Sequence, residues 1–348
     1  MERFVLVRGK KVTLDDVATA VGLSRFLVCR ALTGQPGVNP ETRQRIQETA
    51  TRMGYRGRKT APGPNHQNLS SVALLIDEAE ANRVFWGKII SGIEAAARNA
   101  GCDLLLRAVT REEVERGEIP ALILEGRIKG VLITGNFIPE YVARFERIDC
   151  PVVLVDNYIP VTTHDAVLVA DWEGSYQVTR YMIESGHRKL GYAGQTCGHW
   201  SWSQRFLGFL SALEDNGLKY DPRFAIGSKC GTEVWSSEFM NREVGRMKEM
   251  PTVWICNNDL TANYLIKSLN DLGLAVPEDI SVTGFDNLAP DDSPRVPDLT
   301  TIRVFGSEIG KAAFDQLVWR LGNREAPPRR VMVGVRLIPG LTTASPHA

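Results

Sequence analysis

The chain has 348 residues with 43% hydrophobic and 24% charged side chains, and its 41 basic residues balance 41 acidic ones. This composition is typical of a globular protein with enough core for two or three domains. No apolar run reaches the length of a membrane span, and the N-terminus lacks the long apolar segment and cleavage site of a signal peptide. We therefore expect a cytoplasmic protein with no membrane partner.

The cysteines and histidines give no sign of a metal site. Six Cys and five His are scattered along the chain. They show neither the C-x-x-C spacing of metal sites nor a disulfide framework, as is usual in a reducing compartment. We expect no metal and no cofactor.

The charge is unevenly distributed along the chain. Residues 1–60 hold twelve Lys and Arg against five Asp and Glu, a net charge of +7, so the remaining residues carry −7. A basic segment attached to an acidic body is typical of a phosphate-binding module.

The first predicted helix follows Thr13, which can cap it together with Asp16 three residues later. Gly22 ends this helix because glycine tolerates a left-handed backbone. One apolar face is formed at helical spacing by Leu14, Val17, Ala18 and Val21.

Two further helices are predicted before residue 55. Ser24 can cap the second, and Asn39 followed by Pro40 is a typical start for the third. Their inward positions are Val28, Ala31, Leu32, Ile46, Ala50 and Met53. Two helices joined by a glycine turn form a helix-turn-helix unit, whose second helix enters the DNA major groove. Similar helices occur in domains that never touch nucleic acid, so the basic charge is what favours DNA binding.

The segment 56–70 is basic, then rich in Pro, Gly and Asn without hydrophobic periodicity, which predicts a linker. From residue 71 apolar runs alternate with amphipathic segments, which predicts a doubly wound parallel sheet in two α/β subdomains. The expected strands are 72–76, 103–106, 130–134, 152–155, 189–193, 224–227, 252–256 and 280–283. The expected helices are 85–100, 119–127, 140–147, 174–185, 204–216, 236–250 and 260–272.

Polar clusters follow several of these strands, at 156–157, 257–259 and 284–287. Their amides and carboxylates suit hydroxyl groups, and a cleft between α/β subdomains is a usual ligand site. Helix capping explains Asn258 equally well. Arg205 alone would be a surface arginine. Trp200 and Trp202, in an expected polar loop 194–203, could stack on a sugar ring.

Catalytic motifs are missing from the sequence. It contains no GxSxG elbow, HExxH or P-loop, and a lone G-x-x-G at 191–194 is too weak for a dinucleotide site. We expect that the protein is not an enzyme.

Over residues 12–343 the chain resembles the LacI/GalR (lactose-repressor) family of bacterial transcription regulators. The matching motifs in the head lie at 13–18, 20–24, 28–30, 41–43 and 54–55. Those in the body lie at 92–94, 130–133, 151–156, 186–188, 205–208, 258–259, 276–286 and 299–302. The resemblance implies a three-helix DNA-binding head and a periplasmic-binding-protein-like α/β body that senses a small molecule.

The resemblance also implies an order of domains: a helix-turn-helix domain at 11–57, a hinge or linker at 58–70 and an effector-binding and dimerisation domain at 71–343. Subdomain 1 would take about 71–169 and 305–333, and subdomain 2 about 170–304 and 334–343. The expected partners are double-stranded, pseudo-palindromic operator DNA, a small-molecule effector and a second copy of the chain in a homodimer.

Site residues follow from the same match. Family positions that contact the effector fall on Asp156, Arg205, Asn258 and Asp286, to which we add Phe85, Trp200 and Trp202. Arg25 and Phe26 take the base-reading positions, where arginine can hold guanine and phenylalanine can contact a thymine methyl group. The full set of expected DNA-binding residues is Thr13, Ser24, Arg25, Phe26, Arg30, Thr33, Tyr55 and Arg56.

The chain departs from the family at two places. Leu27 and Cys29 replace hydroxyl residues that would contact phosphate, and Thr33 replaces an asparagine. The family's hinge helix would run through about 59–67, but Pro62 and Pro64 disfavour a helix there, and Pro64 stands where a leucine wedges into the minor groove. We expect a weaker or absent kink in the operator.

We therefore predict a transcription regulator, a repressor, controlled by a sugar or oligosaccharide in the interdomain cleft. A nucleobase or sugar phosphate effector stays open, as does a phosphoprotein partner. The rival hypothesis is a solute-binding protein or sugar-processing enzyme built on the body. The sequence decides neither the operator nor the direction of the effector's action, nor between dimer and tetramer.

Overall fold

The computed structural model describes residues 12–32, 38–53, 55, 70–79, 84–227, 234–288 and 298–346, without the side chains of Phe26 and Cys29. The chain divides into two compact units, Met1–Asn65 and His66–Ala348, which we describe separately as the head and the body. The division falls inside the segment 58–70 expected to be a linker.

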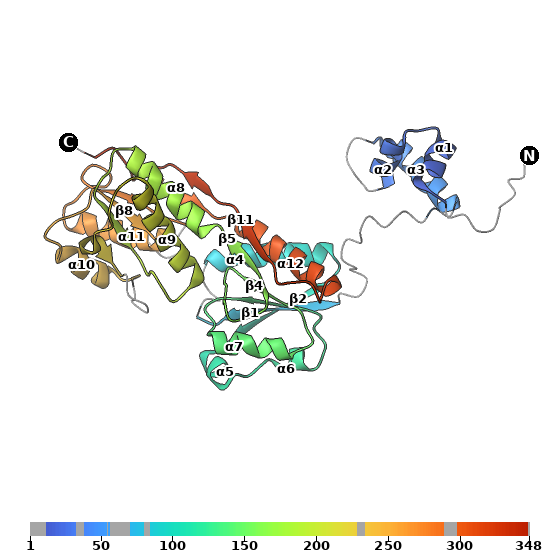
Figure 1. Ribbon diagram of the computed structural model, residues 1–348, viewed down its shortest axis with the longest axis horizontal. Coiled ribbons are helices and arrows are strands. Elements are labelled where there is room, and N and C mark those ends of the chain that lie inside the picture. Colours follow the sequence, from blue (N-terminus) through green and yellow to red (C-terminus); the bar gives the residue numbers. More distant parts are fainter. Residues whose placement is uncertain are drawn as a thin grey trace, which may run out of the picture. The chain divides into compact units, whose positions relative to one another are not determined.

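The head contains the three helices that the sequence predicts (Figure 1): α1 (Leu14–Val21), α2 (Arg25–Leu32) and α3 (Pro40–Arg52). Thr13 and Asp16 form the expected capping box, and Gly22 ends α1 at φ 68°. Asn39 accepts a hydrogen bond from the amide of Glu41, with Pro40 in the first turn of α3. The predicted caps are therefore confirmed.

The expected apolar positions of the head form its core. Val17, Val28 and Ile46 are fully buried and come from all three helices. Tyr55 packs against the edge of this cluster. Each helix buries only one narrow face, so the head depends on all three being packed together.

The first sheet of the body has the strand order β11-β5-β4-β3-β1-β2, with all neighbours parallel. Its strands are β1 (Ser71–Asp77), β2 (Asp103–Val109), β3 (Val131–Thr134), β4 (Val152–Val155), β5 (Asp165–Val169) and β11 (Arg330–Val333). The helices of this subdomain are α4 (Val84–Asn99), α5 (Arg111–Arg116), α6 (Ala121–Leu124), α7 (Pro139–Ala143) and α12 (Gly306–Gly322), with a 3-10 turn at Arg144–Arg147. Both faces of the sheet are covered, which explains the fully apolar runs of β3 and β4.

Helices α4 and α12 cover one face of this sheet and lie against each other (Figure 1). Gly92 allows the close approach, since a Cβ there would lie 2.2 Å from the carbonyl oxygen of Ser307. Gly310 has the same role against Ile89. The start of α12 is therefore held firmly beside α4.

The second sheet has the order β7-β6-β8-β9 and is also parallel. Its strands are β6 (Leu190–Ala193), β7 (Ala225–Ile226), β8 (Val253–Cys256) and β9 (Ser281–Thr283). Its helices are α8 (Asp171–Glu184), α9 (Trp200–Asp215), α10 (Ser237–Gly245) and α11 (Asp259–Asp271), with a 3-10 turn at Pro222–Phe224.

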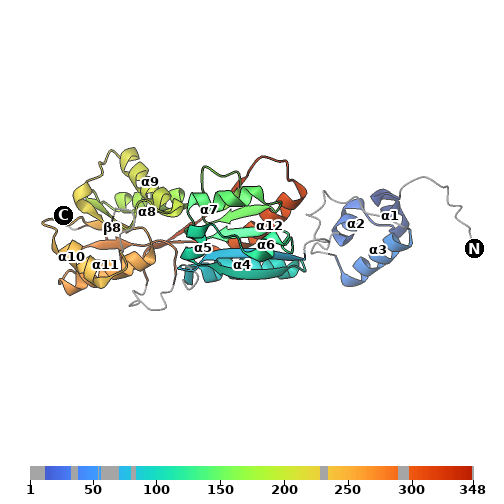
Figure 2. The same cartoon turned by 90° about the horizontal axis from the view of Figure 1, so that it is seen from below.

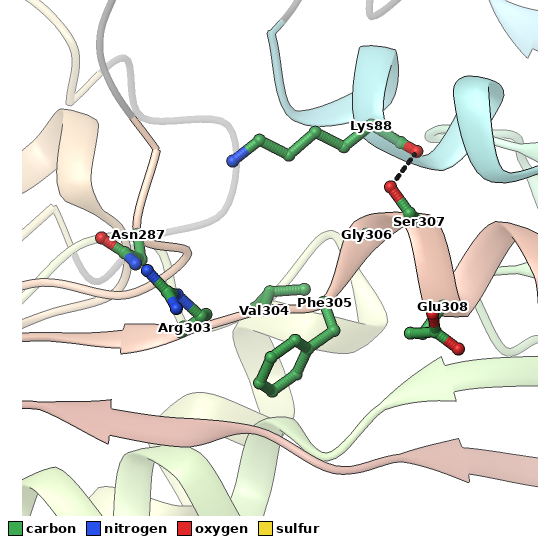
Figure 3. Close-up of a pocket in the computed structure, with 8 residues that line it drawn as sticks. All are labelled: Lys88, Asn287, Arg303, Val304, Phe305, Gly306, Ser307 and Glu308. Carbon is green, nitrogen blue, oxygen red and sulfur yellow. Dashed lines mark hydrogen bonds between the residues drawn. The ribbon is translucent and has the colours of Figure 1, made fainter.

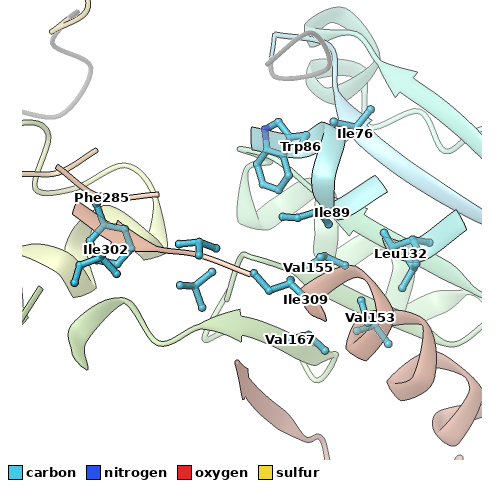
Figure 4. Packing of buried hydrophobic residues seen from close by; sticks show 14 of the residues in the cluster. Ile76, Trp86, Ile89, Leu132, Val153, Val155, Val167, Phe285, Ile302 and Ile309 are labelled. Atoms are coloured by element: carbon cyan, nitrogen blue, oxygen red, sulfur yellow. The ribbon is translucent and has the colours of Figure 1, made fainter. Parts of the chain in front are cut away.

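The chain crosses between the subdomains three times: from β5 to α8, from β10 (Thr301–Arg303) to α12, and from β11 to β12 (Arg336–Ile338). Strands β10 and β12 pair antiparallel. Figure 2 shows the crossing segments that run between the two subdomains of the body. One buried cluster continues through these crossings, from Ile76 and Val155 of the first sheet to Phe285 and Ile302 beside the second (Figure 4).

Several sequence expectations need correction. The sequence did not predict strand β5, helix α5 or the elements that follow β9, which are β10, α12, β11 and β12. Helix α9 begins at Trp200, so Trp200 and Trp202 lie in its first turn and not in a polar loop. Cys197 is disulfide-bonded, contrary to the absence of disulfides suggested by the cysteine spacing. Within the described ranges, no helix is long and apolar enough to span a membrane.

Candidate functional site: a buried arginine among carboxylates

The polar clusters that follow the strands meet around Arg205 of α9. Asp156 follows β4, Asn257 follows β8, Asp286 follows β9 and Asp171 begins α8. We call Asp156, Asp171, Arg205, Asn257 and Asp286 the Arg205 cluster. The carboxyl ends of parallel strands meet at one edge of each sheet. The contacts of Arg205 and Ser201 bring residues from these edges of the two sheets together, although they are far apart in sequence.

Arg205 is held by protein groups on every side. Its Nε donates to Asp171 Oδ1 at 2.7 Å and its Nη1 donates to the carbonyl oxygen of Asn257 at 2.6 Å. Nη2 lies 3.1 Å from Asp286 Oδ1, and the guanidinium carbon lies 3.8 Å from the centroid of the Phe285 ring. With 4% exposure, Arg205 is not the surface residue that its sequence context alone suggests.

The site has more carboxylates than cations. Burial raises the pKa of Asp286 to about 6, although the Arg205 charge opposes this. The pKa of Asp156 is also raised, first by burial and then by the neighbouring Asp171. Burial would lower the pKa of Arg205, but Asp286 and Asp171 raise it overall, so its charge is secure.

Asp259, the first residue of α11, extends this acidic environment. It is buried, accepts a hydrogen bond from the amide of Leu288 at 2.8 Å and bonds Thr301 Oγ1 at 2.5 Å. Burial and then the charge of Asp286 raise its pKa to about 8. A protonated Asp259 is therefore the main form near neutral pH.

Residues of α9 connect the two subdomains beside the Arg205 cluster. Ser201 Oγ donates to Asp156 Oδ1 at 3.4 Å. Trp200 packs edge to face on Tyr158, with centroids 4.8 Å apart, and belongs to the apolar cluster on the outer face of the first sheet. Trp200 is thus occupied by a protein contact in this structure.

Trp202 has a different environment. Its ring lies 5.5 Å from that of His199 and 6.2 Å from that of Trp235. Trp235 donates from Nε1 to Thr261 Oγ1 at 3.1 Å. Burial and then the Arg205 charge lower the pKa of His199 to about 4, so it stays neutral and caps α9 by accepting from the amide of Ser201.

The other expected effector residues are more peripheral. Asn258 caps α11, accepting from the amide of Thr261 at 2.8 Å, so the capping interpretation is correct for its side-chain oxygen. Phe85 is half-buried in α4 and packs edge to face on Trp86.

A cavity of about 340 Å³ lies where the chain crosses into α12 (Figure 3). It is lined by Lys88, Asn287, Arg303, Val304, Phe305, Gly306, Ser307 and Glu308. We call it the crossover cavity. Asn287, which lines the cavity, directly follows Asp286, so the cavity lies beside the Arg205 cluster.

Sequence reasoning missed Asp171, Ser201, Tyr158 and Trp235, whereas Asn257 belongs to a polar cluster that it had singled out. Asp171 follows strand β5, just as the other polar clusters follow their strands. Recognising β5 in the sequence would therefore have identified Asp171. No sequence signal pairs Tyr158 with Trp200. In the described ranges, no group of three or more His, Cys, Asp or Glu is arranged to hold a metal.

In the head, several expected DNA-binding side chains serve local structure. Thr13 caps α1, and Ser24 Oγ accepts from the amide of Leu27 at 3.2 Å. Arg25 is exposed and lies 3.6 Å from Asp15. Arg30 is half-buried. Thr33, Arg56 and the side chain of Phe26 lie outside the described residues, as do Pro62 and Pro64 of the expected hinge.

Comparison with known proteins agrees with this architecture. Residues 179–343 match the family model described as a periplasmic binding protein-like domain. The HTH-type transcriptional repressor PurR of Vibrio vulnificus (strain CMCP6) is 24% identical over 322 residues, covering 91% of this chain and 94% of that protein. The repressor CytR of Escherichia coli (strain K12) is 27% identical over 341 residues, covering 96% and 97%.

Solved structures match along nearly the whole chain. The transcriptional regulator CelR in complex with cellobiose has a TM-score of 0.69 at 23% identity, covering 95% of this chain and 100% of that one. The lac repressor dimer bound to operator and the anti-inducer ONPF has a TM-score of 0.67 at 21% identity, covering 96% and 100%. At these identities the likeness shows a shared fold.

A helix-turn-helix head joined to a two-subdomain, periplasmic-binding-protein-like body defines a class of transcription regulators. The chain is similar in sequence to the repressors PurR and CytR and shares the fold of the lac repressor, which supports its resemblance to the LacI/GalR family. These relatives are transcriptional repressors and not enzymes, in agreement with the sequence prediction.

Proposed function

We propose that this protein is a cytoplasmic homodimeric repressor that binds a pseudo-palindromic operator and responds to a carbohydrate held at the Arg205 cluster. The observation that carries the proposal is the contact between subdomains at this cluster. Ser201 of α9 bonds Asp156 of the first subdomain, and Trp200 packs on Tyr158. A ligand inserted there replaces these contacts and changes how the subdomains meet, which is the differential interaction that an effector needs.

A carbohydrate suits the chemistry of the cluster. Asp156 and Asp286 offer acceptors for hydroxyl groups, and the side-chain amide of Asn258 can donate while its oxygen caps α11. Trp202 and Trp235 offer aromatic faces for the apolar side of a sugar ring. The CelR structure contains cellobiose, which supports the same ligand class here.

Arg205 acts mainly by ordering this site. Two of its N–H groups donate to Asp171 and to the carbonyl oxygen of Asn257, and Nη2 forms an ion pair with Asp286 at 3.1 Å. It therefore orients the carboxylates that receive the ligand.

For the head, we propose that α2 lies in the major groove. Arg25 and Phe26 would read bases. The sugar-phosphate backbone of the DNA would be contacted by Thr13, Ser24, Arg30, Thr33, Tyr55 and Arg56. The basic charge of residues 1–60 supplies the attraction to phosphate.

The test uses the full-length protein and DNA from upstream of its own gene, with binding measured by fluorescence anisotropy at several salt concentrations. We expect specific binding that weakens with salt and changes at least severalfold with one member of a sugar panel. Asp156→Asn should still bind DNA but lose most of this response. Asp149→Asn, at a carboxylate with 97% side-chain exposure, is the matched control and should keep it.

No specific complex at any salt concentration would instead favour a solute-binding protein. A response to nucleobases but to no sugar would retain the regulator and reject the carbohydrate.

A further inference from the structure

The crossover cavity is lined by cations from different parts of the body. Lys88 comes from α4, Arg303 ends β10, and the first residues of α12 form its floor. Figure 3 shows Lys88 extending from α4 toward the side that Asn287 and Arg303 line. The cavity therefore joins the two subdomains beside the Arg205 cluster.

Among the described residues, these cations have no acidic partner. Within the described part of the chain, Lys88 Nζ has no hydrogen bond or ion pair, and Arg303 has no carboxylate within 4.0 Å. With the amide of Asn287 oriented so that its oxygen faces Arg303, Nε and Nη2 of Arg303 donate to it at 2.8 and 3.1 Å. The arginine is held in place by a neutral group, which leaves its charge uncompensated.

A third cation adds to the same charge. Arg303 and Arg336 are direct partners in the antiparallel β10–β12 pair. The Arg336 guanidinium carbon lies 5.7 Å from the ring centroid of Phe305, which lines the cavity. Like charges directly opposite across two strands repel each other, so this pair costs stability unless an anion lies near it.

The carboxylates that the structure describes near the cavity do not neutralise these cations. The Glu308 side chain points away from Lys88 in Figure 3. Asp286 feels the Lys88 charge but is paired with Arg205. Helix α12 adds positive potential, since its 17 residues begin without a side-chain cap and its first three residues line the cavity.

We propose that the crossover cavity binds an anionic group, a carboxylate or phosphate, carried by the effector. This rests on the proposed function for the rest of the ligand. The two halves of the site then have opposite roles. The Arg205 cluster, with three carboxylates around one guanidinium, receives hydroxyl groups and repels an anion, and the crossover cavity holds the acidic end. The effector class is therefore an acidic sugar, either a sugar acid or a sugar phosphate.

Such a group would also link the subdomains. Lys88 and Ser307 belong to helices of the first subdomain, whereas Asn287 follows β9 of the second. An anion bound between them favours one relative position of the subdomains, which couples the acidic end to DNA binding.

The experiment follows the backbone amides of Ser307 and Glu308 by NMR in the full-length protein. Inorganic phosphate, D-glucuronate and D-glucose are titrated at constant ionic strength, adjusted with chloride. We expect saturable shifts with phosphate, glucuronate or both, and none with glucose. The anion that binds more tightly identifies the effector's anionic group as a phosphate or a carboxylate. Lys88→Met should weaken anion binding by about tenfold or more, the usual worth of a hydrogen bond to a charged group.

Lys311→Met, an exposed lysine of α12 outside the cavity, is the matched control and should bind the anion as the parent does. A second readout is thermal stability: phosphate should raise Tm of the parent, and this rise should largely disappear in Arg303→Gln. The proposal is overturned if neither anion gives saturable shifts, or if Lys88→Met binds them unchanged. Operator binding, measured on the same samples without anion, reports separately on the proposed function.

Discussion

Trp200 and Tyr158 pack edge to face with ring centroids 4.8 Å apart, although one begins α9 of the second subdomain and the other follows β4 of the first. Arg330 of β11 donates from Nη2 to the Tyr158 hydroxyl oxygen at 2.7 Å and lies over its ring. Tyr158 is thereby fixed from one side while Trp200 binds its other edge. This contact holds the subdomains together beside the Arg205 cluster.

Trp200→Ala should loosen the contact between the subdomains. An edge-to-face aromatic pair contributes about 1 kcal/mol beyond its buried area. We expect a larger radius of gyration in small-angle X-ray scattering without effector. Trp172→Ala is the control, because Trp172 stacks on Tyr176 of its own helix. Equal radii for Trp200→Ala and the parent would show that the pair does not hold the subdomains together.

Arg205→Met should be strongly destabilising. It leaves Asp171 and Asp286 buried without their cation, and breaking a buried ion pair in this way costs about 3–5 kcal/mol. Urea unfolding measures the loss. Adding Asp171→Asn to Arg205→Met should recover part of it, because one uncompensated carboxylate is removed. Additive losses in the double variant would contradict this coupling.

Asp259 should make the protein less stable as pH rises toward 8. Its pKa is about 8 in the folded protein against a usual 3.8, so between these values the folded state binds the extra proton and the free energy of unfolding falls with rising pH. His199, with a pKa lowered to about 4 from 6.5, has the opposite effect below pH 6.5. The effect of Asp259 on the free energy of unfolding is therefore best measured between pH 6.5 and 8.

In that range, urea unfolding of Asp259→Asn should depend less on pH than that of the parent. The amide resembles the protonated carboxyl and can still bond Thr301 and the amide of Leu288. An unchanged pH slope would assign the effect to another group.

Arg25→Ala should weaken operator binding and relax the preferred sequence at one base pair. A bidentate arginine–guanine contact contributes about 1–3 kcal/mol of discrimination. Arg52→Ala, at the exposed end of α3, is the control for general loss of charge. Binding-site selection measures the preference. If Arg25→Ala weakens all sequences equally, Arg25 is a phosphate contact instead.

Operator DNA should be bent less than in the family generally. Pro62 and Pro64 stand where a hinge helix and its minor-groove leucine would lie. Fluorescence energy transfer between the ends of a labelled operator measures the bend, and a Pro62→Ala, Pro64→Leu variant should increase it. A large bend in the parent protein would mean that the prolines do not prevent the wedge.

The sequence by itself determined the three helices of the head and the alternation of strands and helices in the body. The Thr13 capping box, Gly22 and the Asn39–Pro40 start of α3 depend on neighbours within four residues, so local pattern was enough. Buried parallel strands such as β3 and β4 stand out as apolar runs. Strand β5 was missed, because Asp165 and the polar residues before it obscure its short apolar run.

Only the tertiary structure decided what surrounds each site residue. Arg205 is separated by 34 residues from Asp171 and by 52 from Asn257, and no local pattern encodes those partners. Likewise, Arg303 and Arg336 become cross-strand neighbours only when the third crossing pairs β12 with β10. The charge balance of a buried site depends on which distant side chains the fold brings within a few ångströms, and local periodicity carries no information about that distance.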